Sequence, residues 1–416
     1  LGDLLASVKP AHGVGIDFSP AMIEEARKRH PDLEFHVADA LDGIDAKPFD
    51  YILLSDLVND LPDVQAVLER LRPLAHSRTR LVLNFFNFVW RTSLDLGESM
   101  GWKAPTQAQN WLSTTDMQNL LHLAGWEVIT TETRILCPIN IPLLAPLFNR
   151  WMAPVMSSFG LTILQVARPK PVVTHTQQYR CSVVIPARNE AGNIEDAVKR
   201  TPELGLGTEI IFIEGHSKDN TWDEILRVQK AYPDRCIKVM KQQTKGKGGA
   251  VREAFAAATG DILFILDADL TMPPEELPKF YEAARSGTGD FINGVRLVYP
   301  MENQAMQFLN HIANKCFGIA FSWLLGQPVK DTLCGTKVLF RNDYERIAAN
   351  RAYFGDFDPF GDFDLLFGAA KQNLRIIDLP IRYRARTYGE TNIQRWRHGW
   401  LLLRMVIFAA RRMKFL

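Results

Sequence analysis

Two aspartates separated by one residue follow a short apolar run in the second half of the chain. Residues 262–266 are all Ile, Leu or Phe, and Asp267 and Asp269 come directly after them. An apolar run of this length predicts a buried strand, and open α/β sheets bind ligands at the carboxyl ends of their strands. Paired carboxylates there can hold a divalent cation, which can hold a diphosphate. The alternative is that both acids simply precede the next helix, which Pro273-Pro-Glu-Glu276 favours.

A basic, glycine-rich turn lies upstream of this acidic pair. Its sequence is Lys-Gly-Lys-Gly-Gly at residues 245–249, and we expect it to open a helix. Free N–H groups at a helix start and nearby lysines attract phosphate, while glycine lets the backbone come close. Together, the acids and this turn indicate an enzyme that uses a nucleotide-activated donor.

The elements that must position these residues alternate along the chain. In its second half we predict strands at 182–186, 209–214, 236–241, 261–267 and 290–296, with helices at 192–203, 221–231, 249–259 and 273–286. Such alternation predicts a doubly wound α/β sheet with helices on both faces. The first half has the same rhythm, with strands at 12–17, 34–38, 51–55 and 80–84, and helices at 20–30 and 63–71.

The fold class is therefore α/β with two doubly wound domains. We expect a first domain at 1–168, a linker at 169–179 that is poor in large apolar residues, and a second domain at 180–397. Residues 398–416 are expected to form a basic amphipathic helix. Residues 135–167 contain four prolines and Arg150, and we interpret them as two amphipathic helical pieces.

The motifs of the second domain, taken in order, are similar to those of a known family. They are I-P-A-R-N-E at 185–190, E-G-H-S-K-D at 214–219, K-G-K-G-G-A-V-R at 245–252, D-A-D at 267–269 and R-T-Y-G-E-T-N at 386–392. This series resembles family 2 glycosyltransferases of the GT-A fold, with the polyprenyl (dolichol) phosphate sugar transferases as the most similar subgroup. The resemblance implies a nucleotide-diphospho-sugar donor and inversion at the sugar carbon.

The resemblance also implies roles for individual residues. Asp267 and Asp269 would hold Mg²⁺ or Mn²⁺ and act in catalysis, which stabilises charge on the leaving diphosphate. Asp364 would lie near the attacking oxygen. The residues that would bind substrate are Pro186, Ala187, Arg188 and Glu190 in the nucleotide pocket, Glu214 at the base, Lys247 near the diphosphate, and Arg296 and Arg386 on the acceptor phosphate.

This sequence departs from the family pattern at two positions. Gly215 stands where the family often has a second acid, and Thr271 stands where some relatives have another polar residue near the metal. Two of the site residues could instead have a purely structural role: Asp364 could flank a turn into a helix at 365–371, and Arg296 could pair with a neighbouring acid. We assign no chemistry to the turn at 331–335.

The first domain resembles class I S-adenosylmethionine-dependent methyltransferases. Gly-Val-Gly-Ile-Asp at 13–17 and Phe-His-Val-Ala-Asp at 35–39 each end a predicted strand in an acid. The resemblance implies that Asp17 binds the ribose, Asp39 the adenine and Ser55 the methyl donor, with Gly2 as the last glycine of the cofactor turn. We expect the domain to be truncated at its N-terminus. The alternative is that both aspartates only cap helices.

Composition and charge exclude several classes of protein. The net charge of +1 argues against a nucleic-acid binder, and five scattered cysteines favour a reducing cytosol over a disulfide framework. No uninterrupted apolar run reaches the length of a membrane span. Residues 381–416 carry nine Lys/Arg against one acid, which indicates either a membrane-surface helix or a helix docked on its own domain with a solvated basic face.

We therefore consider three functions. The first is a sugar transferase fused to a methyltransferase, acting at the cytoplasmic membrane face on a lipid phosphate or an envelope glycan precursor; with a hydroxyl acceptor, Asp364 would be the base. The second is an enzyme similar to nucleotide-sugar pyrophosphorylases, which would lack the late R-T-Y-G-E-T-N motif. The third is a non-catalytic protein that binds nucleotide-sugar or membrane.

Overall fold

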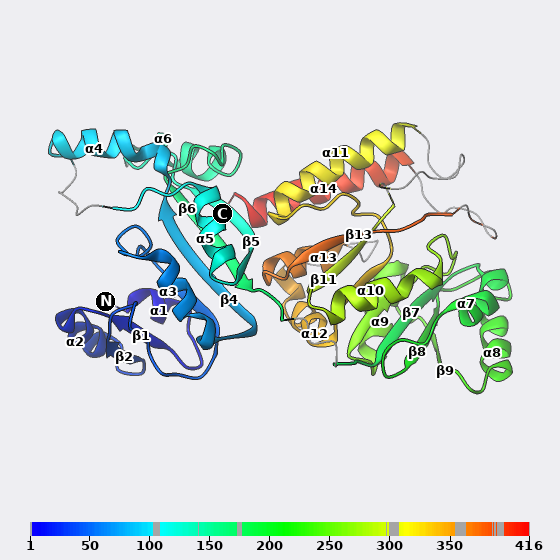
Figure 1. Ribbon diagram of the computed structural model, residues 1–416. Coiled ribbons are helices and arrows are strands. Elements are labelled where there is room, and N and C mark those ends of the chain that lie inside the picture. The colour runs from blue at the N-terminus through cyan, green and yellow to red at the C-terminus, as the bar shows by residue number, and fades with distance from the viewer. Residues whose placement is uncertain are drawn as a thin grey trace. The chain divides into compact units, whose positions relative to one another are not determined.

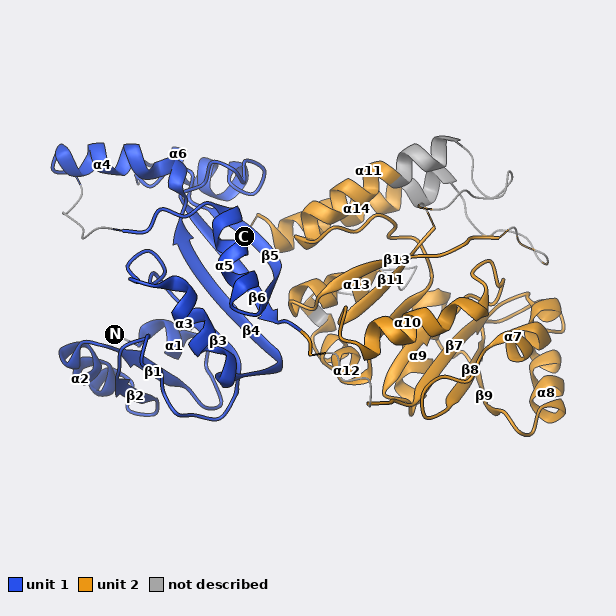
Figure 2. Cartoon of the chain, in the orientation of Figure 1, with its two compact units in different colours: residues 1–170 blue, residues 171–416 orange. Residues whose placement is uncertain are grey.

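The structure is a computed structural model that divides into two compact units, residues 1–170 and 171–416 (Figure 2). It describes residues 2–102, 109–139, 141–172, 177–296, 298, 308–353, 363–384, 386, 388 and 395–415. Each unit contains its own sheets and its own hydrophobic clusters.

A mixed seven-stranded sheet forms the centre of the second unit (Figure 1). Its spatial order is β13-β11-β12-β10-β7-β8-β9. The strands are β7 (Cys181–Ala187), β8 (Thr208–Glu214), β9 (Cys236–Lys241), β10 (Ile262–Ile265), β11 (Phe291–Val295), β12 (Lys337–Phe340) and β13 (Ile376–Pro380). All pairings are parallel except those of β12, which runs antiparallel to both β10 and β11.

Helices cover both faces of this sheet. Successive strand residues point to opposite sides, and both sides are apolar, so each needs a cover. In β7, Val184 belongs to one apolar cluster, while Val183 and Ile185 belong to the other. The first cluster lies under α9 (Gly246–Ala257), α11 (Phe308–Leu325), α12 (Arg341–Ala349), α13 (Phe363–Lys371) and α14 (Arg395–Met413). The second lies under α7 (Ile194–Arg200), α8 (Thr221–Ala231) and α10 (Leu277–Arg285). The second unit is thus covered on both sides, as expected.

The first unit contains two separate sheets. One pairs β1 (Val14–Asp17) with β2 (Glu34–Val37) in parallel. The other has the order β3-β4-β6-β5, formed by β3 (Phe49–Leu54), β4 (Ala75–Phe86), β6 (Thr162–Pro169) and β5 (Trp126–Arg134). In this second sheet β3 pairs with β4 in parallel, while β6 runs antiparallel to both of its neighbours, β4 and β5.

The helices of the first unit are short. They are α1 (Asp3–Ser7), α2 (Pro20–Arg29), α3 (Val64–Arg70), α4 (Arg91–Ser99), α5 (Thr114–Leu123) and α6 (Leu144–Pro146), with a π-helical turn at Leu147–Met152 and a 3-10 turn at Phe88–Trp90. Side-chain caps start several of them. Ser113 and Asp116 form a reciprocal capping box at α5, and Asp63 caps α3 by accepting from Ala66 N.

One prediction about the elements of the first unit was wrong. Residues 135–167 do not form two helical pieces, because the stretch from Thr162 onward is strand β6, and only α6 and the π-helical turn are helical within the described part of that segment. The same strand extends to Pro169, so the first residue of the predicted linker belongs to the sheet. Pro169 is tolerated there because β6 ends at that residue.

Candidate functional site

Most of the predicted site residues of the second unit lie near one edge of its sheet, on strand ends, on the loops that follow them or in the first turn of α9. The carboxyl ends of β7, β8, β10, β11 and β13 share this edge because those strands are parallel to one another. The strand β12 is reversed, so the loop before it, at 331–336, reaches the same edge. Chain segments more than 100 residues apart in sequence therefore supply one site.

Asp267 forms an ion pair with Lys247 at this edge. The distance from Lys247 Nζ to Asp267 Oδ1 is 2.6 Å, and each side chain is about one third exposed. Burial by itself raises the pKa of the Asp267 carboxyl. The charge and the hydrogen bond of Lys247 lower this pKa and outweigh burial, so the net pKa is below its ordinary value. Asp267 is therefore a carboxylate at neutral pH.

Gly335 explains how the loop before β12 can pass so close to this pair. A Cβ atom added to Gly335 would lie 2.0 Å from Asp267 Oδ2 and 2.5 Å from Lys247 Nζ. No side chain fits in that space without moving the acid or the lysine. Position 335 was among the residues to which we assigned no chemistry, yet its lack of a side chain is what leaves room for the ion pair.

Arg386 joins Asp269 to Glu190. Its guanidinium donates to Asp269 Oδ2 at 2.7 Å and to Glu190 Oε1 at 3.0 Å. The other oxygen of Asp269 accepts hydrogen bonds from the backbone N and the hydroxyl of Thr271, at 3.1 and 2.8 Å. Burial raises the pKa of the Glu190 carboxyl, against the lowering effect of Arg386 and Asn193. Thr271 thus orients Asp269 rather than standing apart from it.

We call the five residues Glu190, Lys247, Asp267, Asp269 and Arg386 the acid–base cluster. It holds three carboxylates against two cations, so one negative charge is in excess. In the described part of the chain, no three His, Cys, Asp or Glu side chains converge closely enough to hold a metal ion by themselves. The hard oxygens of Asp267 and Asp269 nevertheless suit Mg²⁺ or Mn²⁺ if a ligand supplies further oxygens and engages the two cations.

The five residues predicted to contact the nucleotide, Glu190 among them, lie on the neighbouring strands β7 and β8 or shortly after β7. In the parallel register Pro186 is opposite Ile213, and Ala187 is opposite Glu214. Arg188 is exposed, while the buried Glu214 accepts a hydrogen bond from the backbone of Ser217. Gly215 N donates to Ala187 O at 2.8 Å, which ties the two strand ends together.

Arg296 is engaged by Asp331 in a buried ion pair. Its Nε and a terminal nitrogen donate to the two carboxylate oxygens at 2.7 and 2.8 Å, and the exposed fractions are 11% for Arg296 and 1% for Asp331. Burial alone raises the pKa of Asp331, but Arg296 lowers it below its ordinary value overall. Pairing with a neighbouring acid is the structural role that the sequence left open for Arg296. The partner lies in the turn to which we assigned no chemistry.

Asp364 belongs to another group of charged side chains. Its Oδ2 lies 3.0 Å from Arg351 Nε and 3.4 Å from a terminal nitrogen of Arg252, and its side chain is 11% exposed. Arg252 is on α9, the helix that the basic turn opens. Most of the R-T-Y-G-E-T-N motif lies outside the described residues, although Arg386 itself is described.

In the first unit, the acids predicted to bind a cofactor make local hydrogen bonds. Asp17 Oδ1 accepts from the backbone N of Ser19, and Asp39 Oδ1 accepts from that of Leu41, both at 2.8 Å. Ser19, not Asp17, caps α2. Ser55 Oγ lies 3.4 Å from Asp56 at the carboxyl end of β3, and Gly2, with φ of 83°, caps α1.

Comparison with known proteins gives two family matches and several relatives. Residues 182–348 match the family "Glycosyl transferase family 2", and residues 1–81 match a family described as "Methyltransferase domain". The dolichol-phosphate mannosyltransferase of Pyrococcus furiosus is 28% identical over 222 residues, which are 52% of this chain and 59% of that protein. Glycosyltransferase AglD of Haloferax volcanii is 28% identical over 230 residues, which are 54% and 36% of the two chains.

This chain therefore spans less than two thirds of the length of either relative. Among solved structures, glucosyl-3-phosphoglycerate synthase from Mycobacterium tuberculosis, in complex with Mn²⁺, uridine diphosphate and glucosyl-3-phosphoglycerate, matches with a TM-score of 0.41 and 19% identity. That match covers 56% of this chain and 80% of the other. By these matches, residues 182–348 are similar to glycosyl transferase family 2, and residues 1–81, ahead of them in the chain, are similar to a methyltransferase family.

Proposed function

We propose that the second unit transfers a sugar from a nucleoside-diphosphate donor to a lipid phosphate at the cytoplasmic face of a membrane, in a metal-dependent reaction. The acid–base cluster is the observation that carries this proposal. It places two carboxylates for a cation beside Lys247 and Arg386, which suit an anionic diphosphate. The dolichol-phosphate mannosyltransferase relative supports the choice of a polyprenyl phosphate as acceptor.

The pairing within the cluster suggests how a donor would be bound. Lys247 and Arg386 now neutralise Asp267 and Asp269, so a donor diphosphate that takes over Lys247 and an acceptor phosphate that takes over Arg386 would leave two carboxylates facing a bound Mg²⁺ or Mn²⁺. The metal, when bound, offsets the charge that builds on the leaving diphosphate. Thr271 holds Asp269 in place throughout, and Gly335 leaves the space that Asp267 needs. Glu214 and Arg188 would contact the base and ribose from the ends of β7 and β8.

A lipid phosphate is already anionic at neutral pH, so the reaction needs no proton removal. This agrees with the surroundings of Asp364, whose Oδ2 already contacts two arginines and is better suited to orienting them than to accepting a proton. Arg386 would grip the acceptor phosphate, and so would Arg296 if it left Asp331. A hydroxyl acceptor, with Asp364 as general base, is the alternative reaction.

The helix α14 is a suitable site for peripheral membrane contact. One face packs into the unit's core through Leu402, Met405 and Ala409. The opposite face is exposed and combines apolar with basic side chains, namely Trp400, Leu403, Arg404, Ile407 and Arg411. Among helices whose residues the structure describes, none has both the length and the apolar character required to span a bilayer. We therefore propose that this exposed face lies on the membrane surface.

A donor and acceptor screen tests the proposed transfer. The full chain is incubated with UDP-, GDP- and dTDP-sugars, polyprenyl phosphate and Mg²⁺ or Mn²⁺, and mass spectrometry is used to detect a glycolipid. We expect one donor to give product that disappears when EDTA is added. Turnover that persists in EDTA would contradict the metal assignment, and product formed only on hydroxyl acceptors would favour the alternative reaction.

We propose a second function for the first unit, binding of S-adenosylmethionine, because residues 1–81 match a methyltransferase family. Asp17 and Asp39 end neighbouring parallel strands or follow them, so both lie at one edge of the small sheet. Isothermal titration with S-adenosylhomocysteine tests this function. Binding that survives Asp17→Ala and Asp39→Ala unchanged would contradict the assignment of these residues.

A further inference from the structure

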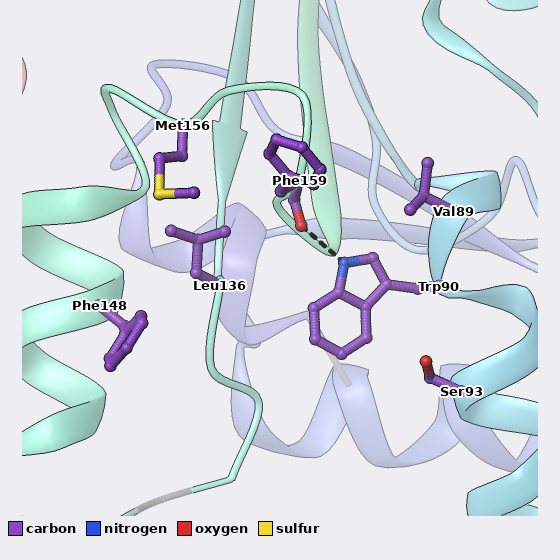
Figure 3. A pocket seen from close by; sticks show the side chains of 7 residues that line it. All are labelled: Val89, Trp90, Ser93, Leu136, Phe148, Met156 and Phe159. Atoms are coloured by element: carbon purple, nitrogen blue, oxygen red, sulfur yellow. Dashed lines mark hydrogen bonds between the residues drawn. The ribbon is translucent and has the colours of Figure 1, made fainter.

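An apolar pocket of about 370 Å³ lies in the first unit. It is lined by Val89, Trp90, Ser93, Leu136, Phe148, Met156 and Phe159 (Figure 3). Val89, Trp90 and Ser93 belong to the 3-10 turn and to α4, and the other four belong to residues 136–159, which connect β5 to β6. The volume is within the range of small-molecule pockets.

The chemistry of the lining selects against a polar ligand. None of the seven residues is charged, and Ser93 is the single side chain with a hydroxyl. The indole N–H of Trp90 already donates to the carbonyl of Phe159 at 2.8 Å, so it is engaged within the protein (Figure 3). A ligand inside the pocket would gain apolar contacts and little else, which suits a hydrocarbon chain.

Buried or partly buried polar groups outside the pocket fix its walls. The buried Asn87 donates to the carbonyls of Ser158 and Gly160, at 3.1 and 3.0 Å, and so ties the loop before β6 to the end of β4. Asn149 exchanges two hydrogen bonds with the backbone of Cys137, at 2.8 and 2.9 Å, which fixes the π-helical turn against the segment after β5. The pocket is therefore preformed.

The surface next to the pocket is also apolar. Residues 141–159 contain one charged side chain, Arg150, and expose Leu143, Leu147, Trp151 and Val155 by 47–88%. Exposed apolar patches of this kind mark binding surfaces in folded proteins. A chain that enters the pocket could continue along this surface rather than end in water.

The topology places the pocket at an edge of the sheet that also bears a polar group. The strands β3, β4 and β5 are parallel to one another, since β6 is antiparallel to both β4 and β5. The segments that line the pocket follow β4 and β5, and Ser55 follows β3, so all lie at the same edge. A molecule with an apolar chain and a polar head could therefore reach both.

We propose that this pocket binds the hydrocarbon chain of a single lipid molecule, which makes a lipid the substrate class of the first unit. The proposal does not depend on sugar transfer, because none of the lining residues lies in the second unit. Chain binding can be measured without donor, metal or S-adenosylmethionine. Its failure would consequently be distinguishable from failure of either proposed activity.

The test uses the full chain and the uncharged fluorescent probe N-phenyl-1-naphthylamine, displaced by 1-hexanol, 1-octanol and 1-decanol. We expect the affinity of the alcohols to rise about fourfold for each added methylene until the pocket is full. Ser93→Trp fills the pocket and Met156→Glu places a charge in it, and both should weaken alcohol binding by about tenfold or more. Circular dichroism confirms that each variant is folded.

Two matched controls separate the pocket from the general surface. Leu96→Trp introduces the same residue on α4, and Met100→Glu makes the same Met-to-Glu change at an exposed position directly after α4; neither position lines the pocket. Both controls should bind like the wild type. An equal loss of alcohol affinity in the controls and in the pocket variants would overturn the proposal, and so would a probe that the alcohols do not displace. If Met156→Glu does not fold, the comparison of Ser93→Trp with Leu96→Trp decides, since Ser93 is exposed. If the protein binds phosphatidylcholine vesicles but the alcohols do not displace the probe, the apolar residues contact a bilayer surface and do not hold a single chain.

Discussion

The buried ion pair between Arg296 and Asp331 gives a quantitative prediction about stability. We expect Asp331→Asn to lower the free energy of unfolding of the second unit by about 3 kcal/mol, since removing one partner of a buried pair leaves the other charge uncompensated. Solvent screening reduces this value little, because Asp331 is 1% and Arg296 11% exposed. Replacing both residues, as Arg296→Met with Asp331→Leu, should cost clearly less than Asp331→Asn alone.

Urea titration of the full chain measures this effect. Peptides that cover β11 and β12 are followed by hydrogen–deuterium exchange, so that the second unit is recorded separately from the first. With a slope of roughly 3 kcal/mol per M, a loss of about 3 kcal/mol shifts the midpoint by about 1 M. A shift below about 0.3 M, or a double variant that loses the summed cost of the single variants Asp331→Leu and Arg296→Met, would refute the reasoning.

The pH dependence of this pair follows from the direction of its pKa shifts. The folded-state pKa of Asp331 is lowered, so its contribution to stability is present above the unfolded value of about 3.9 and is lost as pH falls through the folded value. The pKa of Arg296 is raised well above its ordinary value, against the effect of burial, because of Asp331. Its titration lies above any working pH. The difference in the free energy of unfolding between wild type and Asp331→Asn should hence be constant from pH 5 to 8 and shrink below pH 4.

Three further predictions concern other parts of the chain. Asp269→Asn should lower metal-dependent transfer by about 100-fold or more without unfolding the protein, as measured by product formation and circular dichroism, and turnover close to wild type would exclude Asp269 from the metal site. Replacing Arg404 and Arg411 with Glu should weaken the affinity for anionic vesicles, measured by co-sedimentation, by about tenfold or more, since each basic residue contributes roughly 1 kcal/mol. Unchanged co-sedimentation would exclude α14 as the membrane contact. Burial raises the pKa of Cys181 to about 12, so iodoacetamide at pH 8 should label the exposed Cys236 and leave Cys181 unmodified by mass spectrometry, whereas equal labelling would show that Cys181 is accessible.

Much of the second unit's fold could be predicted from the sequence because its strands are strongly apolar. The predicted strand at 236–241 and helix at 221–231 have the observed bounds, and the four other predicted strands differ from β7, β8, β10 and β11 by a few residues. The strands β12 and β13 were missed. They are short, and β12 begins with the fully buried Lys337, so neither has the apolar run or the alternation that indicates a strand.

The antiparallel part of the first unit was missed for a different reason. The strand β6 includes Gln165 and Arg168, both buried, and follows a proline-rich segment. The side chain of Arg168 pairs with Glu127 on β5, and this partner becomes visible only once the two strands are paired. Local pattern carries no information about such a contact.

Within the site, residue types were predictable and their partners were not. The pairing of Arg386 with Glu190 joins positions 196 apart in sequence, and that of Lys247 with Asp267 depends on how α9 meets β10. The roles of the site residues remain predictions. The contribution of Gly335 depends on a close approach between two loops, which no local pattern reveals.

The reversed strand β12 makes the two loops at its ends unequal. For every other strand of the second unit's sheet, the loop that follows the strand lies at the edge that carries the acid–base cluster. For β12, it is the loop that precedes the strand. An insertion or deletion just before Lys337 would therefore alter the space around the acid–base cluster, while the same change after Phe340 would fall at the opposite edge of the sheet. We therefore expect a change in loop length to affect the acid–base cluster when it precedes β12 and to leave the cluster unchanged when it follows β12.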